Sequence, residues 1–230
     1  MATEKKEQTP GVYDEIFAEG GYHGSYDLHY KMSPYYPMYK KVLTFIRKSH
    51  VGGILEIGCG TGAFARMVMD TTNLKYQGFD FSPVAIKKSG IITGEPGLFH
   101  IGDATKIESY PKEYEAIACT EVLEHIPEDL RCIEQWKKGA MCFCSVPNYD
   151  SQYHVRFFNR SQDVYKRYGE LLDIQWITKV KKPVLSNLSL TSYLQYIRWN
   201  RFRPKRLLAA LGLGRFQDVG GWFVFVGIKK

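Results

Sequence analysis

The run Leu55-Glu56-Ile57-Gly58-Cys59-Gly60-Thr61-Gly62 decides the fold of this 230-residue chain. The apolar residues in front of Gly58 predict a short buried strand, and a helix is expected to follow over 63–70. Between the two, glycines at alternate positions let the backbone turn tightly and approach a ligand closely. The nicotinamide-dinucleotide fingerprint needs its third glycine three residues after the second, and a P-loop needs Gly-Lys-Ser/Thr, so this run matches neither.

Glu56 adds a carboxylate at the end of this strand, just before the glycine loop. A pyrophosphate would be repelled by that charge, whereas an ammonium or sulfonium cation would be attracted. The loop therefore favours a nucleoside ligand that carries positive charge.

Strands and helices alternate from residue 53 to residue 146, and polar residues end each strand. This rhythm predicts an α/β fold with a doubly wound, mostly parallel sheet, whose site lies at the carboxyl ends of the strands. Strands are expected at 53–57, 76–79, 98–101, 114–119, 140–146, 172–180 and 221–228, and helices at 37–48, 63–70, 83–89 and 127–137.

Outside this core we expect residues 1–50 to form a tail and a tyrosine-rich cap, and residues 51–230 to form the main domain. A basic helical insertion at about 186–218 lies between the last two expected strands and is predicted to be a lid. Residues 1–149 carry a net charge of −3 and residues 150–230 a net charge of +10. The C-terminal part is therefore expected to meet something anionic.

Three acids stand at the ends of successive strands of the expected sheet. Asp80 comes 18 residues after Gly62, where a carboxylate typically accepts hydrogen bonds from ribose hydroxyls. Asp103 could accept a hydrogen bond from an exocyclic amine such as adenine N6, and Glu121 ends the fourth strand. Phe81 could lie against the base, and Ser82 suits the N-cap of the next helix.

The order of these motifs resembles the class I S-adenosylmethionine-dependent methyltransferases, in particular those that act on small molecules. The resemblance covers roughly residues 40–180. It rests on Leu55 to Gly62, Gly78-Phe79-Asp80-Phe81-Ser82, Gly102-Asp103-Ala104, Glu121-Val122-Leu123-Glu124-His125-Ile126 and Ser145-Val146-Pro147-Asn148. It implies a seven-stranded Rossmann-like sheet, with the last two strands antiparallel to each other and the insertion between them as a departure.

The same resemblance implies that S-adenosylmethionine is the cofactor and that the glycine loop holds its methionine end. Asp80 would bind the ribose, Asp103 and Ala104 would meet the adenine edge, and Glu56 would orient the loop or the amino group. A glycine-flanked flap around Tyr22 could close over the cofactor. The expected cofactor-binding residues are Glu56, Gly58, Cys59, Gly60, Gly62, Asp80, Phe81, Ser82, Asp103, Ala104, Glu121 and Tyr22.

A hydroxyl acceptor must lose a proton during methyl transfer, so a base is expected near the strand ends. His125 follows the fourth strand, and His154 comes seven residues after Pro147 on the loop that leaves the fifth. Both are catalytic candidates. The alternatives are that His125 packs or caps and that His154 ties its loop to the sheet.

Substrate contacts are expected from Tyr26, Arg156, Arg198 and Arg201. Arg156 could instead simply pair with a carboxylate. The two last arginines lie in a basic, aromatic stretch at 193–206. That stretch could bind a phosphate- or carboxylate-bearing small substrate, touch an anionic membrane surface, bind nucleic acid, or be a solvated face. The acidic first half of the chain disfavours nucleic acid.

The favoured function is O-methylation of a sugar, a sugar phosphate or a secondary metabolite. N-methylation of a small amine or peptide, methylation of RNA, and a cofactor-binding partner without catalysis stay open. No apolar run approaches the ~20 residues of a membrane span, and the charged N-terminal sequence is unlike a secretory signal. Five cysteines without a Cys-x-x-Cys pair indicate reduced thiols, a cytoplasmic protein and no metal site. The oligomeric state is left open.

Overall fold

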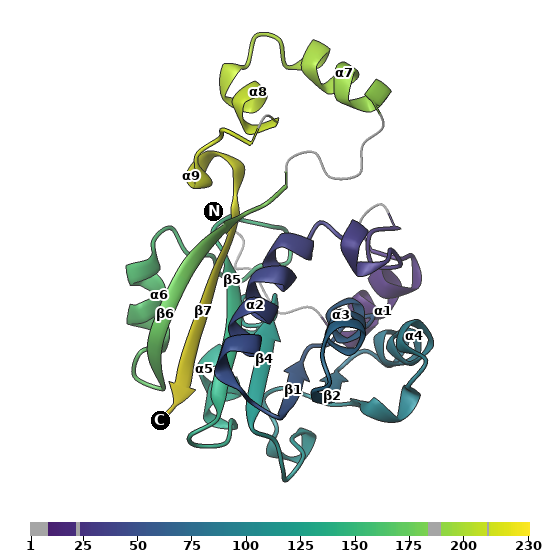
Figure 1. The fold of residues 1–230 in the computed structure, drawn as a ribbon, viewed down its shortest axis with the longest axis vertical. Coiled ribbons are helices and arrows are strands. Elements are labelled where there is room, and N and C mark those ends of the chain that lie inside the picture. Colours follow the sequence, from purple (N-terminus) through teal and green to yellow (C-terminus); the bar gives the residue numbers. More distant parts are fainter. Residues whose placement is uncertain (1–8, 22–23, 184–189, 211) are drawn as a thin grey trace.

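A seven-stranded sheet with helices on both faces forms the body of the computed structural model, which describes residues 9–21, 24–183, 190–210 and 212–230 (Figure 1). The strand order is β3-β2-β1-β4-β5-β7-β6. Strands β1 to β5 pair with one another in parallel, and β7 runs antiparallel to both of its neighbours, β5 and β6. The strands are β1 (Gly53–Ile57), β2 (Lys75–Asp80), β3 (Phe99–Ile101), β4 (Ala116–Thr120), β5 (Met141–Pro147), β6 (Leu172–Lys181) and β7 (Gly221–Lys229). The predicted fold class, with its antiparallel last pair, is confirmed.

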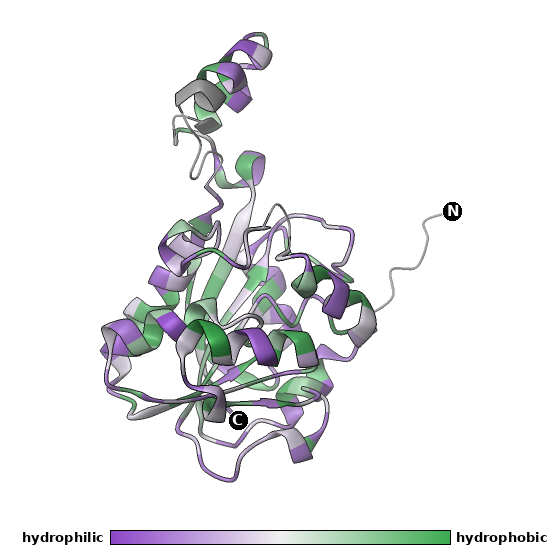
Figure 2. Cartoon of the chain, turned by 90° about the vertical axis from the view of Figure 1, so that its right-hand side faces the viewer, coloured by the Kyte–Doolittle hydropathy of each residue, from purple (hydrophilic) through white to green (hydrophobic). Residues whose placement is uncertain are grey.

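The helices of the described residues include two that the sequence reading did not predict, α1 and α6. The helices are α1 (Pro10–Ala18), α2 (Tyr36–Ser49), α3 (Ala63–Thr71), α4 (Pro83–Thr93), α5 (Asp129–Glu134), α6 (Ser161–Tyr168), α7 (Leu190–Trp199), α8 (Pro204–Ala210) and α9 (Phe216–Val219). Figure 2 shows hydrophobic and hydrophilic residues alternating along them, as expected of helices that cover a sheet.

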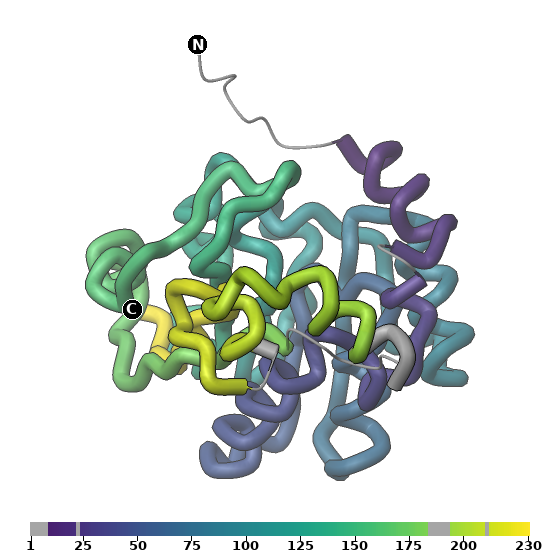
Figure 3. Tube along the Cα trace, turned by 90° about the horizontal axis from the view of Figure 1, so that it is seen from above, coloured from purple at the N-terminus to yellow at the C-terminus, as the bar shows by residue number. Residues whose placement is uncertain are grey.

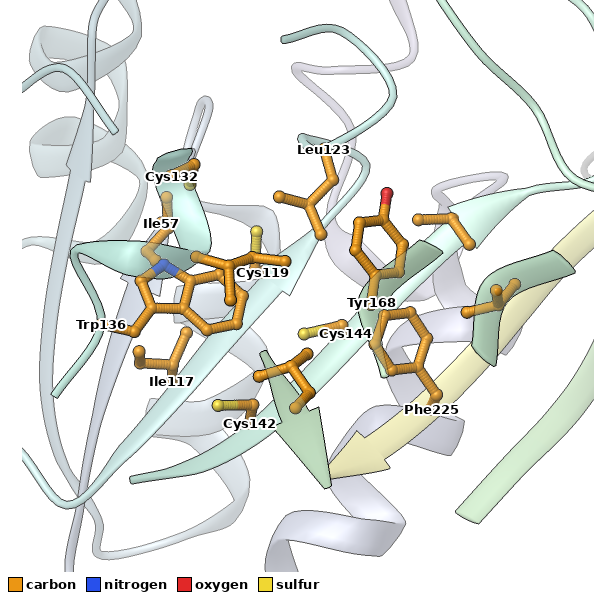
Figure 4. Close-up of a cluster of buried hydrophobic side chains, with 14 of the residues drawn as sticks. Ile57, Ile117, Cys119, Leu123, Cys132, Trp136, Cys142, Cys144, Tyr168 and Phe225 are labelled. Carbon is orange, nitrogen blue, oxygen red and sulfur yellow. The ribbon is translucent and has the colours of Figure 1, made fainter. Parts of the chain in front are cut away.

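Alternate residues of each central strand point to opposite faces of the sheet, and both faces are buried. Ile54 and Ala116 pack with residues of α2 and α3 on one face. Leu55 and Ile117 pack on the other, with Trp136 and residues of α5 and α6 (Figure 4). All five cysteine thiols are buried and form no disulfide. Two buried faces explain why the strands read as continuous apolar runs.

The N-terminal cap is fixed to the sheet by α1. The Ser82 hydroxyl donates a hydrogen bond to Asp14 of α1 and accepts one from the backbone N–H of Ala85, 3.1 Å away. Ser82 is thus the N-cap of α4, as predicted, and it also anchors the cap. The tail expected over residues 1–10 falls mostly on residues outside the described ranges, and the structure begins α1 at Pro10.

The insertion between β6 and β7 stands away from the sheet as α7 and α8 (Figures 1 and 2), and viewed from above it lies over the other elements (Figure 3). Trp199 is 72% exposed and Phe202 is 83% exposed. Its last helix, α9, is docked on the sheet, because the ring of Phe216 packs 5.2 Å from that of Phe223 on β7. Within the described ranges, no helix has the length and apolar character that crossing a membrane requires.

Candidate active site

A cavity of about 270 Å³ opens at the carboxyl ends of β1, β2 and β4, beneath the N-terminal cap. Its floor comes from the sheet, one wall from α1 and the cap, and another from the loop after β5. The predicted residues that line it are Glu56, Gly58, Cys59, Gly60, Asp80, Phe81, Asp103, Ala104, Glu121, Tyr26, His125 and His154. The position of the cavity agrees with the general rule for open α/β sheets.

The glycine loop has three residues in the left-handed backbone region, with φ values of 66° at Gly58, 51° at Gly60 and 84° at Gly62. A Cβ on Gly58 would lie 2.4 Å from Val122, and one on Gly62 would lie 3.0 Å from the backbone of Ser89. Gly60 is different, because a Cβ there would come no closer than 3.7 Å to its nearest neighbour. Gly58 and Gly62 therefore permit the packing of the loop, and Gly60 leaves room for a ligand.

Asp80 holds the loop in this shape through both carboxylate oxygens. Oδ2 accepts the backbone N–H of Gly60 at 2.9 Å, and Oδ1 accepts that of Ser82 at 3.0 Å. Burial raises the pKa of Asp80 to about 6, against the effect of these hydrogen bonds. Each oxygen keeps acceptor capacity for a further donor. Asp80 therefore fits the ribose diol of the cofactor that the sequence predicts.

Glu56 lies at the other side of the loop and accepts a hydrogen bond from the hydroxyl of Tyr76. Burial raises its pKa to about 8, the Tyr76 hydrogen bond lowers it, and the negative charge of Asp80 raises it further. A cation bound between these two carboxyl groups would relieve their repulsion. The two carboxyl groups thus fit a ligand that carries an ammonium and a sulfonium group.

The raised pKa values predict how the ligand-free protein responds to pH. Between pH 6.5 and 8 the folded protein keeps a proton on Glu56 that the unfolded chain, with an ordinary value of 4.5, has released. The unfolded state then binds fewer protons, so the free energy of unfolding falls as pH rises. His125 does not contribute in this window, because burial lowers its pKa to about 4 from an ordinary 6.5.

Urea unfolding at pH 6.5 and at pH 8 measures this loss. Glu56→Gln cannot titrate, and we expect it to lose less stability over the interval than the parent. Equal losses in the parent and in Glu56→Gln would contradict the assignment of the buried proton.

His125 and His154 form one wall of the cavity, with ring centroids 4.9 Å apart. Nδ1 of His125 lies 3.0 Å from the carbonyl oxygen of Tyr153, and Nδ1 of His154 lies 3.2 Å from that of Tyr149. A carbonyl oxygen can only accept, so a hydrogen bond of this kind puts the proton on Nδ1 and the lone pair on Nε2. The hydroxyl of Tyr13 lies 2.9 Å from Nδ1 of His125 and brings α1 to the pair.

Glu121 has an unusual backbone for a residue that is not glycine, with φ at 58°. Its N–H donates to the hydroxyl oxygen of Ser145 at 3.1 Å, and the hydroxyl of Tyr149 donates to its Oε2 at 3.4 Å. Burial raises its pKa to about 6. Residues held in this backbone region cluster at functional sites, and Glu121 faces the cavity beside the glycine loop.

Several predicted residues lie elsewhere. Arg156 points away from the cavity, because its guanidinium donates to the carbonyl oxygens of Leu123, Ile126 and Pro127 and pairs with Asp129 at 3.2 Å. Gly62 and Ser82 do not line the cavity and lie behind residues that do. Arg198 and Arg201 are exposed on the insertion and do not line the cavity, and Tyr22 lies outside the described residues.

Several residues that line the cavity were not predicted from the sequence. Tyr35, Tyr39 and Tyr149 bring phenol rings to it, and Lys182 lies 4.7 Å from the ring centroid of Tyr149. The tyrosine-rich composition of residues 11–50 signalled an aromatic cap but did not say which rings face inward. Tyr26 does line the cavity as predicted, and its carbonyl oxygen accepts the hydroxyl of Thr61 at 2.7 Å.

Two curated proteins match part of the chain. A tocopherol O-methyltransferase of rice is 22% identical over 150 residues, which are 58% of this chain and 41% of that protein. A ubiquinone biosynthesis O-methyltransferase of Thiobacillus denitrificans is 27% identical over 110 residues, 44% of this chain and 47% of that protein. The matched region thus spans less than half of the length of either relative.

Solved structures share the fold across nearly the whole chain. The [4+2]-cyclase SpnF has a TM-score of 0.65 at 15% identity and covers 99% of both chains. An S-adenosylmethionine-dependent methyltransferase of Thiobacillus denitrificans, solved with S-adenosylhomocysteine, has a TM-score of 0.57 at 13% identity over 90% of this chain and 96% of its own. A family model described as a methyltransferase domain matches residues 30–203. Together with the glycine loop and its acidic neighbours, this match shows that the chain belongs to the class I S-adenosylmethionine-dependent methyltransferases.

Proposed function

We propose that the protein transfers a methyl group from S-adenosylmethionine to a hydroxyl oxygen of a small acceptor. The observation that carries this proposal is the pair His125 and His154, which stands in the wall of the same cavity as the glycine loop. When bound, the cofactor supplies a methyl group that is already activated. The chain has chiefly to place the acceptor oxygen in line with it and to assist the loss of the hydroxyl proton.

The cofactor side of the proposal assigns residues by the groups they offer. Gly60 gives room for close approach, Asp80 offers carboxylate oxygens to the ribose, and Asp103 and Ala104 line the cavity where the adenine edge is expected. Glu56 and Glu121 place carboxyl groups beside the loop, and a bound cationic cofactor would favour their ionised form.

Aromatic rings line the part of the cavity that we assign to the acceptor. Tyrosine rings come from the cap and from the loop after β5, and the described lining holds one cation, Lys182. The arginines expected to hold an acceptor anion, Arg156, Arg198 and Arg201, do not line the cavity. Among the acceptors that the sequence suggests, these walls favour an aromatic or apolar secondary metabolite with a hydroxyl group over a phosphorylated sugar. The names of the two curated relatives, both O-methyltransferases, support an oxygen acceptor.

The proposal is tested by incubating the protein with S-adenosylmethionine that carries a labelled methyl group and with a panel of phenols, sugars, sugar phosphates and amines. Transfer of the label to each compound is measured. We expect transfer to hydroxylated compounds and a fall in kcat of about 100-fold or more for His154→Ala, with little change in cofactor affinity. Arg201→Ala is the matched control, because this exposed residue does not line the cavity. Label found only on nitrogen, or full turnover by His154→Ala, would overturn the assignment.

A further inference from the structure

Glu124 carries a buried carboxyl group in the turn that follows β4. Its side chain is 0% exposed. Neither of its oxygens accepts a hydrogen bond from the described part of the chain. Its polar neighbours include the carboxyl group of Glu121, and two ionised carboxylates would repel each other. A buried carboxyl group without hydrogen-bond donors is costly to the folded state, so its presence points to a ligand that supplies the missing interaction.

Two histidines lie beside this carboxylate. One ligand atom each of Glu124, His125 and His154 lies within 4.8 Å of the other two. An octahedral ion with bonds of ~2.1 Å separates opposite ligands by ~4.2 Å. Adjacent ligands of such an ion lie ~3 Å apart, so the three side chains would move closer by up to about 2 Å to share one ion.

The backbone orients both imidazoles for such a role. Nδ1 of each ring lies against a carbonyl oxygen, Tyr153 for His125 and Tyr149 for His154. Metal-binding histidines typically donate their second ring nitrogen in this way, which fixes the ring and directs the other nitrogen to the metal. The three residues come from the turn after β4 and the loop after β5, so the fold assembles them at the carboxyl edge of the sheet.

We propose that Glu124, His125 and His154 bind a divalent metal ion in the wall of the cofactor cavity. Two imidazoles and a carboxylate suit a first-row transition ion such as Mn²⁺, Fe²⁺ or Zn²⁺ better than an all-oxygen Ca²⁺ site. Three protein ligands leave coordination positions open, as in catalytic sites. Glu121, next to Glu124 and lining the cavity, adds negative charge that attracts the ion.

The site deepens the proposed function and rests on it: the acceptor would be a hydroxyl compound whose oxygen can ligate a metal ion. A ligated hydroxyl loses its proton to water more readily than one in solution. The acceptor oxygen then forms its bond to the methyl carbon as the carbon–sulfur bond breaks, and the electron pair of that bond stays on sulfur. His154 would then be needed for activity because it is a ligand of the metal ion.

Calorimetric titration of EDTA-treated full-length protein with MnCl₂, and separately with ZnCl₂, tests the site without an acceptor. We expect one ion per chain, with affinity at least about 10-fold weaker in Glu124→Gln and in His154→Ala. His100→Ala is the matched control, because this exposed histidine on β3 bonds the carbonyl oxygen of Ser109, away from the cluster. S-adenosylhomocysteine binding by every variant shows that it is folded.

A second readout separates ligation from a structural role. Glu124→Gln replaces the buried carboxyl group by a neutral amide that can donate a hydrogen bond to Glu121, so we expect it to raise the Tm of the metal-free protein and to abolish the rise in Tm that Mn²⁺ gives the parent. No uptake of Mn²⁺ or Zn²⁺ at millimolar concentration by protein that binds S-adenosylhomocysteine would overturn the metal site and leave the proposed function standing. Uptake unaffected by Glu124→Gln and His154→Ala would also overturn it. Failure of the parent protein to bind S-adenosylhomocysteine would overturn the proposed function itself.

Discussion

Asp80→Ala is expected to weaken S-adenosylmethionine binding about 100-fold or more. The carboxylate of Asp80 is buried and already accepts the N–H groups of Gly60 and Ser82, so its remaining lone pairs are held in place before the ligand arrives. Hydrogen bonds to a charged group contribute about 1.5–3 kcal/mol each, and the loss of two corresponds to at least that change in Kd. The substitution also releases the N–H of Gly60, which shapes the loop.

Titration calorimetry with S-adenosylhomocysteine measures the effect. Asp70→Ala is a suitable control, because this carboxylate pairs with Arg66 at 2.8 Å on the outer surface of α3 and does not line the cavity. We expect its Kd to equal that of the parent. An Asp80→Ala protein whose Kd stays within threefold of the parent would show that the cofactor does not use this carboxylate.

Asp129→Ala is expected to lower the free energy of unfolding by about 3–5 kcal/mol. Asp129 is 0% exposed and receives the guanidinium of Arg167 at 2.5 Å, that of Arg156 at 3.2 Å and the hydroxyl of Tyr168 at 2.9 Å. Removing the carboxylate leaves two partly buried cations without their counter-charge. A loss of this size is a large fraction of the stability of a typical domain.

Urea unfolding gives the comparison, and Glu128→Ala supplies the control from the neighbouring position. Glu128 pairs with Arg131 at 3.6 Å, and both side chains are more than half exposed, so we expect a change below about 1 kcal/mol. Equal effects of the two substitutions would mean that the buried cluster contributes no more than a surface ion pair.

The Asp129 cluster explains the position of Arg156. Its guanidinium ties the loop that carries His154 to the carbonyl oxygens of Leu123 and Ile126, which flank His125. The sequence left two roles open for Arg156, holding an anionic substrate group or pairing with a carboxylate, and the structure shows the pair with Asp129. The order of residues does not reveal that an aspartate on α5 would be buried within reach of that cation.

The strands, the glycine loop and its acids could be predicted because their signals are local. Short apolar runs ending in glycine or acid fix β1 and β2 to within a residue or so, and the carboxyl-edge rule then brings Asp80, His125 and His154 to one cavity. The helix α1 could not be found this way. It begins with Pro10-Gly11 and buries only Phe17, and its place depends on the contact of Asp14 with Ser82.

The surroundings of Glu124 also could not be predicted from the sequence. The sequence placed Glu124 in a family motif, but the three-dimensional arrangement is needed to show a carboxyl group beside two imidazoles with no hydrogen-bond donor among the described residues. For the same reason the basic insertion could be predicted as helices but not positioned, since exposed side chains such as Trp199 leave no packing signal.

Titration of the parent protein with S-adenosylhomocysteine tests the central claim most directly, because it requires neither an acceptor nor a metal ion. The cavity of glycines and buried carboxylates predicts one ligand per chain with micromolar affinity. An absence of binding at millimolar ligand, by protein that unfolds cooperatively, would contradict the assignment of this cavity to the cofactor.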